Sequence, residues 1–225
     1  MQILLKCKTT KNEIPLEYRK AIMSLLKNSI KEKSPILYSK YYDNTKKKDF
    51  TFSLYAKNIC FKNDKFEIDD NQVYIQISTS DTTFGYLLLN VLLNQLHKPY
   101  PLENNNYLIL LSVRQKQDKK ITRDTIVCKT LSPICICEHK KGDNSSTKFY
   151  SIDSPEFIQS IKEKYNVEFQ PLDCKKRIVR HQKMKFETTS GIFVLIGKQH
   201  NLEKLYLNGL GCRTGEGFGK FDIIG

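Results

Sequence analysis

The chain has 225 residues, of which 40% are hydrophobic and 11% aromatic, so it is long enough for one large or two small globular domains and is not a disordered chain. Lysine and arginine outnumber acidic residues by 37 to 24, and the net charge of +13 indicates a polyanionic partner, with the codon bias of an AT-rich genome as the alternative source of lysines. The sequence has no apolar run of about eighteen residues and no signal-peptide pattern, so we expect no membrane partner and a cytoplasmic location.

In the first half, the apolar pattern predicts the element order β-α-β-β-α-β. Residues 2–9 alternate as a strand, and Pro15 opens a helix that extends to Ile30. A polar connection rich in tyrosine and lysine follows at 34–48. We expect strands at 50–55 and 73–78, a buried helix at 84–96 capped by Asp81 or Thr82, and a strand at 106–113.

The second half repeats this order. We expect a long strand at 125–137, a polar hairpin at 138–148, a helix opened by Ser154 and Pro155, β-like stretches at 177–185 and 186–196, a short helix at 202–207 and a closing strand at 218–224. Two such units predict an α+β protein made of two tandem ferredoxin-like domains. We place the boundary in the charged stretch 116–124, which gives domains at 1–120 and 121–225.

Half of the 10 glycines lie in one window, residues 209–219, called the glycine loop below. Glycine is costly to order, so such clustering indicates positive φ angles or close approach of the backbone to a ligand. Exposed rows of backbone N–H groups bind anions, phosphate above all. The window lacks GxxxxGK[ST] and leads into a strand, which excludes a nucleotide P-loop and a dinucleotide fingerprint. We predict contact with a phosphate backbone, and a flexible C-terminal turn is the alternative.

A second basic segment, residues 175–183, alternates cations with apolar residues and is typical of a β-hairpin arm. One interpretation is that the arm grips the phosphates of an RNA stem, and the alternative is an edge strand protected by charge. The sequence has no RNP1 signature. The residues predicted to bind RNA in the two segments are Lys176, Arg177, Arg180, Lys183, Gly209, Gly211, Arg213, Gly215, Gly217 and Gly219.

The histidines and cysteines give weaker signals. No histidine precedes His97, and we interpret His139 as a solvent-facing residue beside a hairpin. The seven cysteines lie mostly in apolar stretches without a CxxC pair, so we expect reduced, mostly buried thiols. Cys135, Cys137 and His139 are a poor match to zinc-binding patterns, and we expect no metal site and no cofactor.

The C-terminal segment resembles the signature of the CRISPR-associated repeat-processing endoribonucleases of the RAMP superfamily, the Cas-six family. That signature is a GxG pair, a short basic spacer and GFG, which here are residues 209–211, Arg213 and residues 217–219. Residues 50–53 are similar to the FTFS strand of the family's first domain, and residues 130–134 to the TxSPI stretch of its second. The resemblance spans nearly the whole chain and implies tandem ferredoxin-like RAMP domains.

The resemblance also implies a reaction, the cleavage of CRISPR repeat RNA into guide units without a metal. The ribose 2′-hydroxyl attacks the adjacent phosphate and the 5′-oxygen leaves, which gives a 2′,3′-cyclic phosphate and a 5′-hydroxyl. This chemistry needs a general base, a general acid and cations that stabilise the phosphorane. The partner implied is precursor CRISPR RNA, with a multisubunit CRISPR effector complex and a homodimer left open.

Many members of that family place a histidine after the first helix, a tyrosine within it and a lysine before the FTFS strand. Here the lysine position matches Lys48, the tyrosine position falls on Met23, and the histidine position falls near Tyr41 and Tyr42. The ordinary pKa is about 10 for tyrosine and about 10.4 for lysine, so neither is a good base at neutral pH without a shift. The predicted catalytic residues are Tyr38, Lys40, Tyr41, Tyr42 and Lys48.

Three interpretations of function stay open. In the first, tyrosine and lysine replace the histidine in an active endoribonuclease. In the second, the chain is a non-catalytic subunit of a CRISPR effector complex that holds repeat RNA. In the third, it is an unrelated ferredoxin-like module that binds a small anion.

Overall fold

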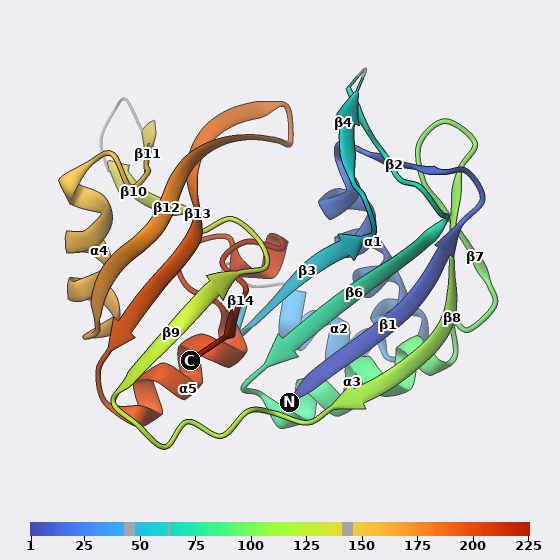
Figure 1. Cartoon of the computed structure of the whole chain (residues 1–225). Coiled ribbons are helices and arrows are strands. Elements are labelled where there is room, and N and C mark those ends of the chain that lie inside the picture. The colour runs from blue at the N-terminus through green and yellow to red at the C-terminus, as the bar shows by residue number, and fades with distance from the viewer. Residues whose placement is uncertain (43–47, 63, 141–145) are drawn as a thin grey trace.

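The computed structural model describes residues 1–42, 48–62, 64–140 and 146–225 (Figure 1). Its first half is an antiparallel sheet with helices packed on one face. The elements of this half are β1 (Gln2–Thr9), α1 (Tyr18–Lys33), α2 (Pro35–Tyr42), β3 (Phe50–Ala56), β6 (Gln72–Thr79), α3 (Thr82–Leu93), β7 (Pro99–Pro101) and β8 (Tyr107–Lys116). A separate small sheet contains β2 (Glu13–Pro15), β4 (Cys60–Lys62) and β5 (Lys65–Glu67).

The second half has the same plan. Its elements are β9 (Thr125–Thr130), β10 (Ile136–Lys140), β11 (Ser146–Tyr150), α4 (Pro155–Tyr165), β12 (Glu168–His181), β13 (Met184–Ile196), α5 (Gln199–Asn208), a 3-10 turn η1 (Thr214–Glu216) and β14 (Phe221–Ile223). The strand orders are β3-β6-β1-β8-β7 in the first half and β12-β13-β9-β14 in the second. Apart from the edge strand β7, both are the ferredoxin-like order, which confirms the predicted fold class.

Local sequence explains the main elements. In β1 the side chains of Ile3, Leu5 and Cys7 are buried because successive residues of a strand face opposite sides of the sheet. The helix α3 begins after Asp81, whose side chain accepts a hydrogen bond from the Phe84 N–H. This satisfies one of the backbone donors that a helix start leaves unpaired, and it confirms Asp81 as the cap.

Two of the predicted segments that lie near the junction of the halves differ from the structure. The connection at 34–48 contains the helix α2, which has no fully buried residue and so lacks the apolar stripe that predicts a helix. The strand at 125–137 is broken, since Leu131 and Ser132 both donate their N–H groups to the carbonyl of Lys220 and leave the sheet before Pro133. The hairpin at 138–148 is present as β10 and β11, and its residues 141–145 lie outside the described part of the chain.

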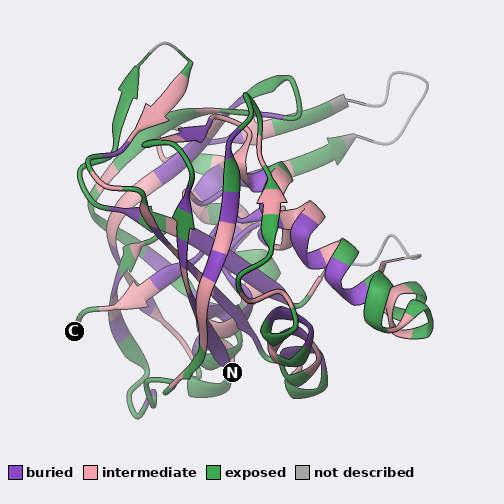
Figure 2. Cartoon of the chain, turned by 90° about the vertical axis from the view of Figure 1, so that its right-hand side faces the viewer, coloured by how far each residue is buried: buried purple, intermediate pink, exposed green. Residues whose placement is uncertain are grey.

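The buried residues, coloured purple in Figure 2, form two large hydrophobic cores, one in each half. The first contains buried residues from Met1 to Leu110, and the second contains buried residues from Ile121 to Phe221. The sheets likewise separate between Lys116 and Thr125, while a boundary at residues 120 and 121 stays a prediction. None of the helices described has the length and apolar character needed to cross a membrane.

The glycine loop packs against both halves. Toward the first half, Arg19 donates from Nε to the Gly217 carbonyl at 3.2 Å, and Thr51 donates to the Phe218 carbonyl at 2.8 Å. Toward the second half, the Gly219 N–H donates to the Pro133 carbonyl at 2.8 Å. The loop therefore joins the two halves.

Candidate functional site

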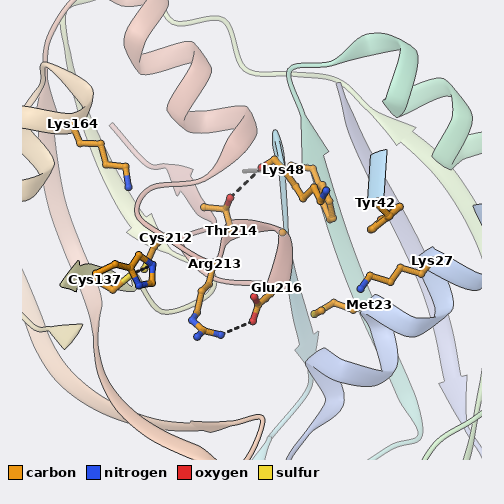
Figure 3. Close-up of a pocket in the computed structure, with 13 residues that line it drawn as sticks. Met23, Lys27, Tyr42, Lys48, Cys137, Lys164, Cys212, Arg213, Thr214 and Glu216 are labelled. Atoms are coloured by element: carbon orange, nitrogen blue, oxygen red, sulfur yellow. Dashed lines mark hydrogen bonds and ion pairs between the residues drawn. The ribbon is translucent and has the colours of Figure 1, made fainter. Parts of the chain in front are cut away.

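A cavity of about 550 Å³ opens between the two halves (Figure 3). The first half lines it from α1, the end of α2 and the start of β3, and the second half lines it from β10, α4 and the glycine loop. A hydrogen bond of 3.4 Å from the Thr214 hydroxyl to the Lys48 carbonyl joins the two walls. The lining residues are Met23, Lys27, Tyr42, Lys48, Phe50, Cys137, His139, Lys164, Cys212, Arg213, Thr214, Gly215 and Glu216.

The cavity is strongly basic. Lysine and arginine line it at four positions, and Glu216 is the acidic residue among the lining residues described. Burial raises the pKa of Glu216, but hydrogen bonding to His181 and the charge of Arg213 lower it more, so the net shift is downward. The carboxylate lies 3.0 Å from the Arg213 Nη1 and 2.9 Å from the His181 Nε2. It is therefore ionised and engaged by two partners, and the cavity keeps an excess of positive charge.

Tyr42 and Lys48, two of the predicted catalytic residues, lie together in this cavity. The Lys48 ammonium donates to the Tyr41 carbonyl and lies 5.3 Å from the centroid of the Tyr42 ring, while the Lys27 ammonium lies 5.4 Å from the same ring (Figure 3). Burial, and to a lesser extent Tyr38, raises the pKa of Tyr42 above its ordinary value. The phenol is therefore protonated at neutral pH and can donate a hydrogen bond but cannot act as a base.

The other predicted catalytic residues do not line the cavity. The ring of Tyr38 stacks on Tyr42 with centroids 5.3 Å apart, and the Tyr41 hydroxyl donates to Asp81 at 3.2 Å. Burial and Asp81 raise the pKa of Tyr41. The ammonium of Lys40 lies 5.3 Å from the Tyr41 ring centroid. Through these contacts the three side chains pack α2 against its surroundings. Their catalytic role stays a prediction.

The glycines of the loop serve packing more than the sequence suggests. An added Cβ at Gly219 would lie 1.9 Å from the Leu210 carbonyl oxygen, and one at Gly217 would lie 2.5 Å from the Phe52 ring. Both have positive φ, +71° and +83°. Glycine is needed here because the backbone approaches both halves closely.

The expectation of exposed N–H groups in the loop is wrong for four glycines. Their N–H groups donate inside the protein, to Leu205, Tyr165, Thr214 and Pro133, from Gly209, Gly211, Gly217 and Gly219 respectively. Arg213 and Gly215 line the cavity. Contact with RNA stays a prediction for all six predicted residues of the loop. The observation that supports it is the position of Arg213 and Gly215 in the cavity lining.

The predicted basic arm is the hairpin of β12 and β13, and its tip rests on the first half. The turn residues Gln182 and Lys183 both have positive φ, as a two-residue hairpin turn of type I′ requires. The Gln182 N–H donates to the Glu17 carboxylate at 3.0 Å, and His181 is buried between Glu17 and Glu216. His181 therefore docks the arm instead of facing a ligand.

The cations of the arm lie in its turn and along β12. Arg177, Arg180 and Lys183 are exposed, and the Lys176 ammonium lies 2.5 Å from Glu187 in the paired strand β13. Arg180 and Lys183 also line a second cavity, of about 530 Å³, that Glu17 and Lys20 line from the first half. The arm thus presents positive charge at the junction of the halves, and its contact with RNA stays a prediction.

Sequence reasoning missed His139 as a site residue. It is exposed, as expected, but it faces the basic cavity from β10. Its Nδ1 lies 2.9 Å from the Thr147 hydroxyl, and its Nε2 lies 4.0 Å from the Cys137 Sγ. The available signal was the alternation of Cys137 and His139, which places both on one face of β10.

The thiols beside His139 form a small cluster. The Sγ atoms of Cys135 and Cys212 are 3.2 Å apart, and hydrogen bonding to Cys212 with burial raises the pKa of Cys137. Over the described ranges, no group of three or more His, Cys, Asp or Glu side chains is arranged to hold a metal ion.

Residues 114–223 match the family described as "CRISPR associated protein Cas6, C-terminal". A comparison with curated proteins finds no match. Several solved structures share the fold. A structure described as "Characterization of a Cas6-related gene from Pyrococcus furiosus" has a TM-score of 0.88 at 16% identity, with 100% of this chain and 98% of that chain covered.

Two further structures agree over similar lengths. One, described as "An RAMP protein binding different RNA substrates", has a TM-score of 0.88 at 19% identity and complete coverage of both chains. A Cas6 product complex from Thermus thermophilus has a TM-score of 0.72 at 16% identity, with 99% of each chain covered. These likenesses establish the fold over the whole chain, and the sequence match covers its second half.

Proposed function

We propose that this chain, whose residues 114–223 match the C-terminal domain of the Cas6 family, binds CRISPR repeat RNA and cleaves the precursor transcript into guide units. The proposed reaction is metal-independent attack of a ribose 2′-hydroxyl on the adjacent phosphate. It leaves a 2′,3′-cyclic phosphate on one product and a 5′-hydroxyl on the other.

The basic cavity between the halves carries this proposal. It brings Lys48 from the first half and Arg213 from the second to one space of about 550 Å³. Fixed cations that need no reorganisation stabilise the charge that develops on a phosphorane, and they do so more strongly where water is excluded. A site whose two walls are joined by the hydrogen bond from Thr214 to Lys48 can also hold the 2′-oxygen, phosphorus and 5′-oxygen in line, and such positioning supplies a large part of the rate.

Two groups in the cavity suit the leaving 5′-oxygen. Tyr42 is a protonated phenol and Lys48 an ammonium, and both are hydrogen-bond donors at neutral pH. Either can protonate or bind the 5′-oxygen as its bond to phosphorus breaks. General acid catalysis of this kind contributes about 10²–10⁴-fold.

The test is cleavage of a cognate repeat RNA in EDTA with protein in excess, beside the same RNA with a single 2′-deoxy substitution at the scissile nucleotide. We expect cleavage of the first RNA, with a 2′,3′-cyclic phosphate on the product, and none of the second. Equal cleavage of both would contradict 2′-hydroxyl attack. Cleavage only after Mg²⁺ is added would contradict metal independence.

A second function, repeat binding without cleavage as a subunit of an effector complex, is favoured by one observation. The first half has no histidine before His97, so the wall that carries Tyr42 and Lys48 offers no ordinary base. Tight binding of both RNAs without product at stoichiometric protein would support this alternative. A complex with other CRISPR subunits and a homodimer are separate predictions, which the mass of the purified protein with and without RNA would test.

A further inference from the structure

We propose that His139 is a catalytic residue whose Nε2 takes the proton from the attacking 2′-hydroxyl. The inference rests on the proposed endoribonuclease function. It assigns the general base, which the cavity wall of the first half does not supply. It places the base on the second half, across the cavity from the wall that carries Lys48 and Tyr42.

The cavity itself narrows the choice of base. Burial and nearby groups raise the pKa of Tyr42, Cys137 and Cys212, so these groups are protonated at neutral pH. Lysine and arginine are protonated as well. Glu216 is an ionised carboxylate, but Arg213 and His181 engage it. Among the lining residues described, His139 is the histidine, and histidine is the side chain that most often takes the proton in general base catalysis.

The ring of His139 is also held in a useful orientation. Its Nδ1 lies 2.9 Å from the Thr147 hydroxyl in the paired strand β11. When Nδ1 carries the hydrogen and donates it to Thr147, Nε2 keeps its lone pair and can accept a proton. Nε2 lies on the side of Cys137, which lines the cavity too.

The groups that line the cavity with His139 on the second half are mostly cationic or neutral. The elements packed near it present Lys164 from α4 and Arg213 from the glycine loop, with the neutral thiols of Cys137 and Cys212 beside them. Glu216 is the acidic lining residue, and it is bound by its two partners.

Nε2 of His139 takes the 2′-hydroxyl proton while the O2′–P bond forms. The P–O5′ bond breaks, and O5′ receives a proton from the Lys48 ammonium or the Tyr42 hydroxyl. His139 then releases its proton to water, and the donor regains one from water. No oxidant, reductant or metal takes part in this step.

The experiment is single-turnover cleavage in EDTA from pH 5 to 9 by the full chain and by H139A and H139Q. The control is H200A, an exposed histidine of α5 outside the cavity. We expect H139A and H139Q to cleave about 10²–10⁴-fold more slowly than wild type with a nearly unchanged dissociation constant for RNA. The rise of the wild-type rate with pH should disappear in both, and added imidazole should restore part of the H139A rate.

A second variant tests the orientation of the ring. Removal of the hydroxyl in T147V frees Nδ1 but keeps the imidazole, so cleavage should slow by less than in H139A and should keep its rise with pH. H200A should match wild type throughout.

The outcomes separate the two proposals. Wild-type rates in H139A would overturn the role of His139 and leave the endoribonuclease intact. A slower H139A that keeps the wild-type pH profile, or that loses RNA affinity in proportion, would also overturn it, because His139 would then be structural. RNA binding without cleavage by the wild-type protein would overturn the endoribonuclease function and this inference with it.

Discussion

Lys220 donates a hydrogen bond from its ammonium to the Ser78 hydroxyl, 2.7 Å away, although the two residues belong to different halves of the molecule. The lysine is fully buried, and burial lowers its pKa to about 7, against the opposing effect of Asp222. A buried lysine with no ion pair in the described structure loses its proton readily on folding. The link between the halves therefore titrates near neutral pH.

The first prediction is that stability rises with pH through this group. Because the pKa is about 7 in the folded protein and 10.5 in a free lysine, the unfolded chain binds more protons between these values. The free energy of unfolding should therefore increase by about 2 kcal/mol from pH 7 to 9. Urea unfolding of wild type and K220M will check this. K220M should lose the increase, and K204M, an exposed lysine of α5, should keep it. An equal pH dependence in K220M would show that other groups cause it.

The second prediction concerns the cavity lysine. Replacing Lys48 with alanine removes a cation that contacts Tyr41 and Tyr42 and faces the cavity. We expect the single-turnover rate of cleavage to fall about 10²–10³-fold with a small change in RNA affinity. K204A, which replaces an exposed lysine of α5 outside the cavity lining, is the matched control, and its rate should stay near that of wild type. An equal fall in K48A and K204A would show that Lys48 has no special part in cleavage.

A third prediction tests the fit of the glycine loop. Gly219→Ala places a Cβ 1.9 Å from the Leu210 carbonyl oxygen at a φ of +71°, so the backbone itself must move. We expect the free energy of unfolding to fall by about 2 kcal/mol or more, measured by urea unfolding. Gly225→Ala meets Val127 at an ordinary 3.4 Å and should change stability little. A stable G219A variant would show that the loop is free to rearrange.

The fourth prediction concerns the arm. If Arg177 and Arg180 contact RNA phosphates, replacing each with alanine should weaken binding at low salt. It should also reduce the slope of log affinity against log salt concentration by about 1 per residue. Filter binding across a salt series with one repeat RNA measures both quantities. K204A should leave the slope unchanged. If the arm variants also leave it unchanged, their charges protect an edge strand instead.

The fold could be predicted from the sequence because local pattern and turn chemistry agree with the tertiary structure. The alternation in β1, the cap at Asp81 and the helix start at Pro155 each determine an element without help from distant residues. The helix α2 could not be predicted in this way, since none of its residues is fully buried. The break after β9 depends on hydrogen bonds to Lys220, far along the chain.

The site was harder to predict than the fold. Lys48 could be named because it lies just before the FTFS stretch that the family resemblance identifies, and Tyr42 because the family's histidine position falls near it. His139 could not be named as a site residue, since its place in the site depends on a cavity whose lining residues extend from Met23 to Glu216. The roles of the loop glycines were misread for a related reason, because glycines that admit a ligand and glycines that admit another part of the protein look alike in sequence.

The position of the glycine loop has a consequence for how the protein unfolds. The two hydrophobic cores are separate, yet Arg19, Thr51 and Ser78 of the first half bond to the segment 217–220 of the second. Neither half can lose its structure without leaving buried polar groups of the other unpaired, which costs about 1–3 kcal/mol each. The energetic unit is therefore larger than either ferredoxin-like fold, and the chain should melt in one cooperative transition whose midpoint is the same for probes placed in either sheet.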